Sequence, residues 1–288
     1  IDAERARIEA NRGRGGWYAE YKTNDEINQR MEALLLQYPN LISRQVIGNS
    51  LQGQPIYALT LSGEGDAASK PALCYNGCQH AREWVSPMTV MYIVENLLQD
   101  YGNDDRITNL LDNLTYYIIP VVNPDGYEYS WSNDRFWRKN RRNNGNGTFG
   151  VDLNRNWSEG WGLDSGSSGS GGSETYRGPA PFSEPETTVV SNFILSRDNI
   201  VGHIDFHSYS QLILWPWGYQ FSEPPEPDRS IHVDIANAMQ QAILSTNGVF
   251  YTPEPAHDLY LASGICTDWV YGAAGAISYT VELRDTGQ

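Results

Sequence analysis

Positive charge, long apolar runs and cysteine are all scarce in this chain of 288 residues. Lys and Arg together number 20 against 35 Asp and Glu, which gives a formal net charge of −15. Such an excess of acid disfavours nucleic acids and anionic membranes as partners. No apolar run approaches the roughly 20 residues that a transmembrane helix needs. We therefore expect no nucleic-acid partner and no membrane partner.

Cysteine is limited to Cys74, Cys78 and Cys266. If the chain from 74 to 78 is extended, its two thiols lie roughly 13 Å apart, which is too far for a disulfide. A bridge between Cys78 and Cys266 stays open, although small buried thiols are the simpler interpretation.

The remaining composition is that of a folded protein. Hydrophobic residues make up 40% of the chain, and charged residues only 19%, which argues against disorder. Abundant Gly and Tyr with little Lys are typical of secreted hydrolases, so we expect an extracellular location.

Apolar runs alternate with helical patterns along the chain. Helices are predicted after a capping box of Thr23 and Glu26, and at 86–100, 106–112, 184–197 and 230–245. Strands are predicted at 42–48, 55–62, 71–77, 115–122, 200–207 and 276–283. This alternation predicts an α/β fold, a single domain with a mixed, mainly parallel twisted β-sheet and helices on both faces. The stretch 123–181 is rich in Gly, Asn and Ser, and so long an irregular segment is usually functional.

Two predicted strands end on side chains that bind metals. His80 and Glu83 follow the strand 71–77, and His207 ends the strand 200–207. The carboxyl ends of parallel strands share one edge of a sheet, where ligands bind. Two histidines and a glutamate make a three-ligand zinc site with an open position. The spacing alone is weak evidence, because a solvated His–Glu pair beside a core histidine has the same letters.

Seven short motifs carry more information than this spacing. In chain order they are HAREW (80–84), PVVNPDGY (120–127), FWRKNRR (136–142), DLNRNW (152–157), HSYSQL (207–212), YLASG (260–264) and ELRDTG (282–287). Together they closely resemble the zinc metallocarboxypeptidases of the pancreatic carboxypeptidase A/B type, over residues 17–287. The resemblance implies a zinc carboxypeptidase catalytic domain at 17–288. Residues 1–16 look like the remnant of an activation segment.

The resemblance also implies a role for each catalytic residue. One zinc ion is expected on His80, Glu83 and His207, with Asp152 orienting the first histidine. Glu282 is expected to be the general base, taking a proton from zinc-bound water and passing it to the leaving amine. Arg138, one of five basic residues in its segment, is expected to steady the oxyanion.

Substrate recognition is implied in the same way. Asn154 and Arg155 are expected to grip the terminal carboxylate, for which a planar guanidinium is suited. Tyr260 is expected to close over the bound residue. The resemblance assigns three further residues to the next subsite, although they could simply support the metal loop: Arg82, Ser208 and Tyr209.

The specificity pocket is expected to be apolar. The position that separates branches of the family lies fifteen residues before the general base, and here it holds Thr267, which carries no charge. The other wall positions are also uncharged: Leu214, Gly218, Leu259, Ala262 and Thr280. We therefore expect a preference for aromatic or aliphatic C-terminal residues. Asp258 and Glu254 keep a mixed preference open.

The expected protein is thus a monomeric zinc exopeptidase acting on peptides and proteins with a free C-terminus. The rival interpretations are a zinc hydrolase of peptidoglycan peptides or small amidated amino acids, a non-catalytic binding protein, and a structural acidic protein. Animal members have a disulfide where this chain has Thr148 and Gly172, so that bridge is missing. The resemblance also implies non-proline cis peptides, which are otherwise rare, at Ser208–Tyr209, Pro216–Trp217 and Arg284–Asp285.

Overall fold

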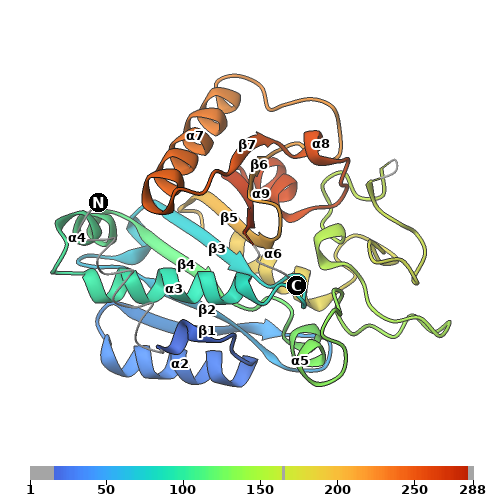
Figure 1. The fold of residues 1–288 in the computed structure, drawn as a ribbon, viewed down its shortest axis with the longest axis horizontal. Helices are drawn as coiled ribbons and strands as arrows, with labels where there is room; N and C mark the ends of the chain where they lie inside the picture. The colour runs from blue at the N-terminus through green and yellow to red at the C-terminus, as the bar shows by residue number, and fades with distance from the viewer. Residues whose placement is uncertain (1–15, 164–165, 285–288) are drawn as a thin grey trace.

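A computed structural model describes residues 16–163 and 166–284, so the segment 1–16, expected to be a remnant of an activation segment, lies almost wholly outside the described residues. Eight strands form one sheet in the order β1-β2-β4-β3-β5-β8-β6-β7 (Figure 1). The central strands β4, β3, β5 and β8 run parallel, and antiparallel pairs flank them on both sides. The strands are β1 (Ile42–Asn49), β2 (Pro55–Leu61), β3 (Ala72–Gly77), β4 (Thr115–Ile119), β5 (Ile200–Ser208), β6 (Leu212–Trp215), β7 (Thr252–Pro255) and β8 (Ile277–Leu283).

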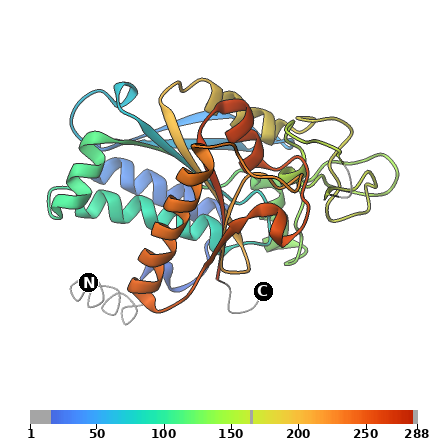
Figure 2. The same ribbon diagram turned by 90° about the horizontal axis from the view of Figure 1, so that it is seen from above.

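Helices cover both faces of this sheet (Figure 2). One apolar cluster joins a face of the sheet to α2 (Asn24–Gln37), α3 (Val85–Asp100), α4 (Asp105–Asn113) and α7 (Asp228–Asn247). A second cluster joins the other face to α6 (Pro185–Leu195) and α9 (Cys266–Ala274). The predicted fold class is confirmed.

Local sequence signals account for several element ends. Thr23 and Glu26 form the predicted capping box at the start of α2. The helix buries the predicted apolar face through Ile27, Met31 and Leu34. Gly248 follows α7 at φ 73°, a left-handed conformation that glycine adopts without strain.

The prediction of irregular chain throughout 123–181 was wrong at its start. Residues Pro124–Ser132 form helix α5, with the Asn123 side chain capping it and proline at its first position. Four further strands and α-helices were not predicted: the short strands β6 and β7, helix α9 and the one-turn helix α8 (Ala256–Leu259). The predicted strand 115–122 ends at Ile119, since Pro120 has no backbone N–H for the ladder.

The three cysteines are free and buried, so the bridge left open between Cys78 and Cys266 is not formed. Their side chains belong to the two different apolar clusters. The expected cis peptides are present at Ser208–Tyr209 and Pro216–Trp217, and Arg284–Asp285 lies outside the described residues. Within the described part of the chain, the helices are too short or too polar to cross a membrane.

Candidate active site

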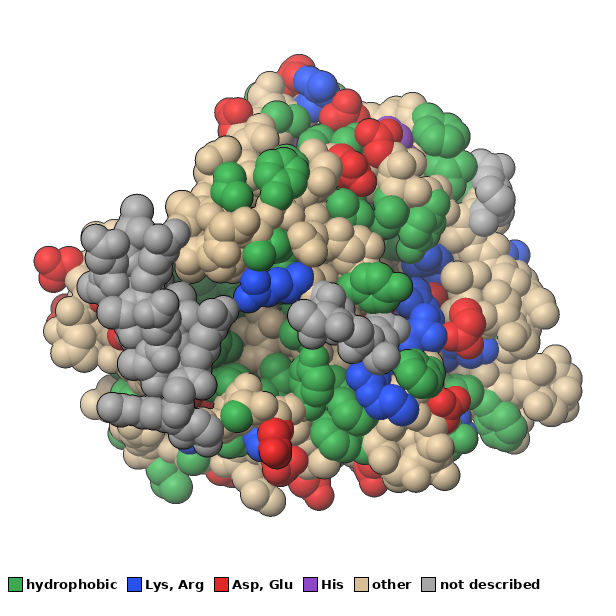
Figure 3. All heavy atoms as spheres, in the orientation of Figure 1, with side chains coloured by type: hydrophobic (Ala, Val, Ile, Leu, Met, Phe, Trp, Pro, Cys, Tyr) green, Lys and Arg blue, Asp and Glu red, His purple; other side chains and the backbone are tan. Residues whose placement is uncertain are grey.

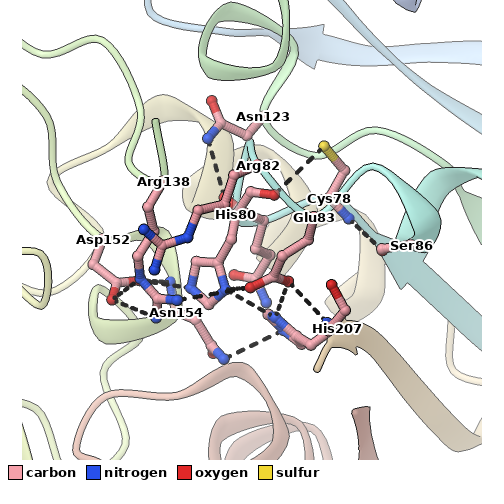
Figure 4. A network of polar contacts seen from close by, with 12 residues as sticks. Cys78, His80, Arg82, Glu83, Ser86, Asn123, Arg138, Asp152, Asn154 and His207 are labelled. Carbon is pink, nitrogen blue, oxygen red and sulfur yellow. Dashed lines mark hydrogen bonds and ion pairs between the residues drawn. The ribbon is translucent and has the colours of Figure 1, made fainter. Parts of the chain in front are cut away.

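The three predicted metal ligands converge at the carboxyl ends of β3 and β5. His80 and Glu83 lie in the turn between β3 and α3, and His207 is the last residue but one of β5. His80 Nδ1 lies 2.8 Å from Glu83 Oε1 and 3.0 Å from His207 Nδ1, and His207 Nδ1 lies 3.0 Å from Glu83 Oε2. All three side chains are buried and point toward one another (Figure 4).

Each histidine is held from behind by a carboxylate. His80 Nε2 lies 3.0 Å from Asp152 Oδ1, and His207 Nε2 lies 2.7 Å from Asp205 Oδ2. A carboxylate can only accept, so each Nε2 donates its proton and each Nδ1 turns its lone pair inward. Two such nitrogens and one carboxylate are a donor set that suits zinc. The residues present therefore fit one zinc ion.

Glu282 lies beside this group. It is the last residue but one of β8, where its Cα is paired with that of His207 in the parallel register. The pKa of Glu282 is raised to about 7, mainly by burial and also by the negative charge of Glu83, with His207 and Arg138 acting in the opposite direction. A carboxylate with that pKa can both accept and return a proton near neutral pH.

Arg138 lies between two carboxylates of the site. Its Nη2 donates to Asp152 Oδ2 at 3.0 Å, and its Nη1 lies 3.7 Å from Glu83 Oε1. Burial would lower the pKa of Arg138, but the attraction of Asp152 and Glu83 raises it above the usual value. The Asp152 carboxylate therefore fixes the orientation of both the Arg138 guanidinium and the His80 imidazole.

Asn154 and Arg155 follow Asp152 in a short 3₁₀ turn, Leu153–Arg155. Two donor groups of Arg155 bind backbone oxygens: Nε donates to Gly166 O at 3.0 Å, and Nη1 donates to Asn154 O at 2.6 Å. The Asn154 Oδ1 accepts from Cys266 N at 2.8 Å, so its amide nitrogen faces the metal ligands, 3.4 Å from His207 Nε2. Arg155 and Asn154 are thereby held rigidly next to the site.

The remaining predicted subsite residues differ in their exposure. Tyr260 is 52% exposed, and Arg155 Cζ lies 5.9 Å from the centre of its ring. Tyr209 is exposed as well, whereas Ser208 is buried and its Oγ makes no hydrogen bond within the described residues. Arg82 donates to Phe136 O and to Glu174, both at 3.2 Å. Figure 3 shows Lys and Arg side chains gathered toward one side of this face of an otherwise acidic protein.

Several of the predicted wall residues pack near one another, whereas Leu259 is 37% exposed and lies outside their cluster. Leu214 and Ala262 belong to one small buried cluster with Ile265. Gly218 is packed against the same group, because a Cβ there would lie 2.7 Å from Ile265 Cδ1. The Thr267 and Thr280 hydroxyls lie 2.5 Å apart, so each satisfies the other and neither brings a charge.

Asp205 is the residue that the sequence reasoning missed. It stands two residues before His207 in the strand motif HIDFH, and alternate residues of a strand share a face. This spacing could have indicated that Asp205 contacts His207. A buried acidic side chain in an apolar strand is energetically costly unless it has a partner.

Comparisons with known proteins agree with this geometry. Residues 27–288 match the family described as Zinc carboxypeptidase. Carboxypeptidase A1 of Rattus norvegicus is 39% identical over 272 residues, which are 94% of this chain and 64% of that protein. The chain therefore spans slightly less than two thirds of that relative's length.

Solved structures are similar as well. Bovine thrombin-activatable fibrinolysis inhibitor, in complex with tick carboxypeptidase inhibitor, superposes with a TM-score of 0.85 at 35% identity, over 95% of this chain and 89% of that one. Carboxypeptidase A from Helicoverpa armigera gives a TM-score of 0.85 at 32% identity, over 94% and 66% of the two chains. The predicted resemblance is confirmed. The chain belongs to the zinc carboxypeptidase family.

Proposed function

We propose that this chain hydrolyses the C-terminal peptide bond of peptides and proteins, as a zinc-dependent carboxypeptidase that prefers apolar or aromatic C-terminal residues. The observation that carries the proposal is the convergence of His80, Glu83 and His207 with Glu282 at their side. Arg155, fixed next to this group, suits a substrate that ends in a free carboxylate.

Each residue has a task in this reaction. His80, Glu83 and His207 would hold the zinc ion, which as a Lewis acid polarises the carbonyl and lowers the pKa of water. Arg155 and Asn154 bind the terminal carboxylate and so place the scissile carbonyl beside Arg138. The Arg138 guanidinium donates to the oxygen on which negative charge develops.

Proton movement is assigned to Glu282. Its carboxylate accepts the proton of the attacking water at one oxygen. The same carboxyl group then returns that proton to the leaving nitrogen, which departs as an amine. Because the pKa of Glu282 is raised to about 7, mainly by burial, this group can hold and release a proton near neutral pH. Tyr260 covers the bound C-terminal residue during these steps.

The same proposal covers the context of the domain. Residues 17–288 are taken as the catalytic domain and 1–16 as the remnant of an activation segment. The protein is taken as secreted, because of its composition, and as monomeric. Light scattering on a sizing column and comparison of culture medium with cells would test these two points.

The experiment that tests the activity is the release of free amino acids from N-blocked dipeptides. The same substrates with an amidated C-terminus provide the control, because an amide cannot pair with Arg155 as a carboxylate does. Hydrolysis of the free acids alone supports the proposal. Equal hydrolysis of both sets, or of neither, contradicts it.

A further inference from the structure

A stripe of polar side chains lies on one face of strands β3, β5 and β8 and leads to the metal ligands. β5 contributes His203 and Asp205 from alternate positions, and His207 completes the series at the site. Each has a polar register partner on a neighbouring strand, with Asn76 of β3 beside Asp205 and Ser278 of β8 beside His203. Polar groups in the interior of a sheet are costly unless all are paired, so this stripe calls for an explanation.

Asp205 is the centre of the stripe. It is fully buried, and its Oδ1 accepts from Asn76 Nδ2 at 2.5 Å. Its Oδ2 accepts from Gln79 Nε2 at 2.5 Å and from His207 Nε2 at 2.7 Å. Gln79 is itself fixed, because its Oε1 accepts from Trp157 Nε1 at 3.0 Å. Three donors from three different segments therefore hold the carboxylate in one orientation.

The polar groups at the end of the stripe away from the metal ligands are also hydrogen-bonded to one another. Asn76 gives its amide hydrogen to Asp205, so its Oδ1 accepts from His203 Nε2, 2.5 Å away. His203 Nδ1 then accepts from Ser278 Oγ at 2.9 Å. Burial lowers the pKa of His203 to about 4, which keeps this ring neutral. The amides and the neutral ring bring no charge to balance Asp205.

The two carboxylates behind the metal ligands therefore differ. Asp152 forms an ion pair with Arg138 in addition to its contact with His80. Among the described residues, the ion pair of Asp205 is with His207 alone. A buried carboxylate needs an opposite charge nearby. The imidazole of His207 joins Asp205 to the cation expected at its Nδ1.

We propose that Asp205 is a positioning residue for the metal centre, holding His207 Nε2–H so that Nδ1 points at the ion. This inference rests on the proposed function, since it assumes that the His80–Glu83–His207 group binds zinc. Outer partners of metal-bound histidines fix the ring and raise its basicity, and their loss costs about 10–100-fold in metal affinity.

The test is the zinc dissociation constant of the full chain, measured by competition with a chelator. Asp205→Ala should raise it about 10–100-fold, and the near-isosteric Asp205→Asn about tenfold, because the amide keeps one acceptor and opposes a donor. Ser278→Ala is the matched control. It removes a buried hydroxyl from the same stripe without touching Asp205, and its zinc affinity should stay within about twofold of wild type.

A second readout separates positioning from a loss of packing. Histidine-labelled, zinc-loaded wild type should show hydrogen-bonded Nε2–H resonances for His80 and His207. Asp205→Ala should lose the one that belongs to His207, and Ser278→Ala should keep both. If Asp205→Ala fails to fold, the zinc dissociation constant of Asp205→Asn carries the test, with its expected rise of about tenfold.

An unchanged zinc affinity in the folded Asp205 variants would overturn the inference while leaving the proposed function intact. Equal losses in Ser278→Ala and Asp205→Ala would overturn it too, because the stripe would then act only through general stability. Failure of the wild type to bind zinc would instead contradict the proposed function itself.

Discussion

His207 and Glu282 are register partners on neighbouring parallel strands, so the third metal ligand and the proposed base stand side by side at one edge of the sheet. A sheet register cannot slip by one residue without turning a whole strand to its other face. The distance between ligand and base is therefore set by the core of the protein.

Replacing Glu282→Gln should abolish turnover while leaving zinc binding intact, because the amide cannot accept the proton. The kcat for an N-blocked dipeptide should fall about 10²–10⁴-fold. Glu64→Gln, at an exposed position, is the control and should be neutral. Activity within about tenfold of wild type would mean that another group acts as the base.

Arg138→Ala should act mainly on kcat, with a fall of about 10²–10³-fold, since its guanidinium is proposed to meet charge that develops in the transition state. Arg141 lies in the same basic segment but stacks on Tyr129, with its Cζ 3.5 Å from the ring centre. Arg141→Ala is therefore a matched control for loss of positive charge. Steady-state kinetics of both variants test whether Arg138 stabilises the developing charge. Equal effects of the two substitutions would contradict this role.

Specificity should follow the uncharged pair Thr267 and Thr280. Substrates ending in Phe, Tyr or Leu should have kcat/KM values about ten- to a hundredfold above those ending in Lys or Arg, because a buried ammonium would lack a counter-ion. Thr267→Asp should shift the preference toward Lys and Arg, and Thr267→Asn, of similar size but uncharged, should not. Wild-type enzyme that cleaves the Arg substrate equally well would defeat the apolar pocket and point to Glu254 or Asp258.

Asp268 should make the folded state less stable as the pH rises. Burial raises the pKa of Asp268 to about 8, against 3.8 for an ordinary aspartate. Between these values the folded chain keeps a proton that the unfolded chain has lost. The contribution of Asp268 is therefore fully present below about pH 4, and it is lost as the pH rises through about 8.

Urea unfolding of the metal-free chain checks this sign. The free energy of unfolding of wild type, relative to Asp268→Asn, should fall with pH by up to about 1.4 kcal/mol per unit within that window. Asp234→Asn, exposed on α7, should leave the wild-type slope unchanged. A wild-type slope identical to that of Asp268→Asn would show that Asp268 is not protonated in the fold.

The elements that the sequence predicted well are those with a strong local signal. The capping box predicted the start of α2, and the long apolar runs predicted β3, β5 and β8. Helix α5 was missed because its nine residues include aromatic, glycine and serine positions without a clear apolar period. Its start was nevertheless readable from Asn123 followed by proline. The four-residue strands β6 and β7 exist only through pairing with their neighbours.

The site shows the same division. His80, Glu83 and His207 were identified by their motifs, and the structure brings them together. Asp205 could not be singled out by those motifs, because its importance lies in where Asn76, Gln79 and His207 meet in space. The mutual pairing of Thr267 with Thr280 is likewise a tertiary fact. Contacts between distant segments decide these features, and single-residue patterns do not record them.

The central claim is that His80, Glu83 and His207 hold one catalytic zinc ion. It is tested most directly by measuring metal content and dipeptide hydrolysis on the same sample before chelation, after it, and after zinc is returned. The account predicts one zinc ion per chain, loss of hydrolysis together with the metal, and recovery with added zinc. Full hydrolysis by a sample verified to be free of metal would contradict it.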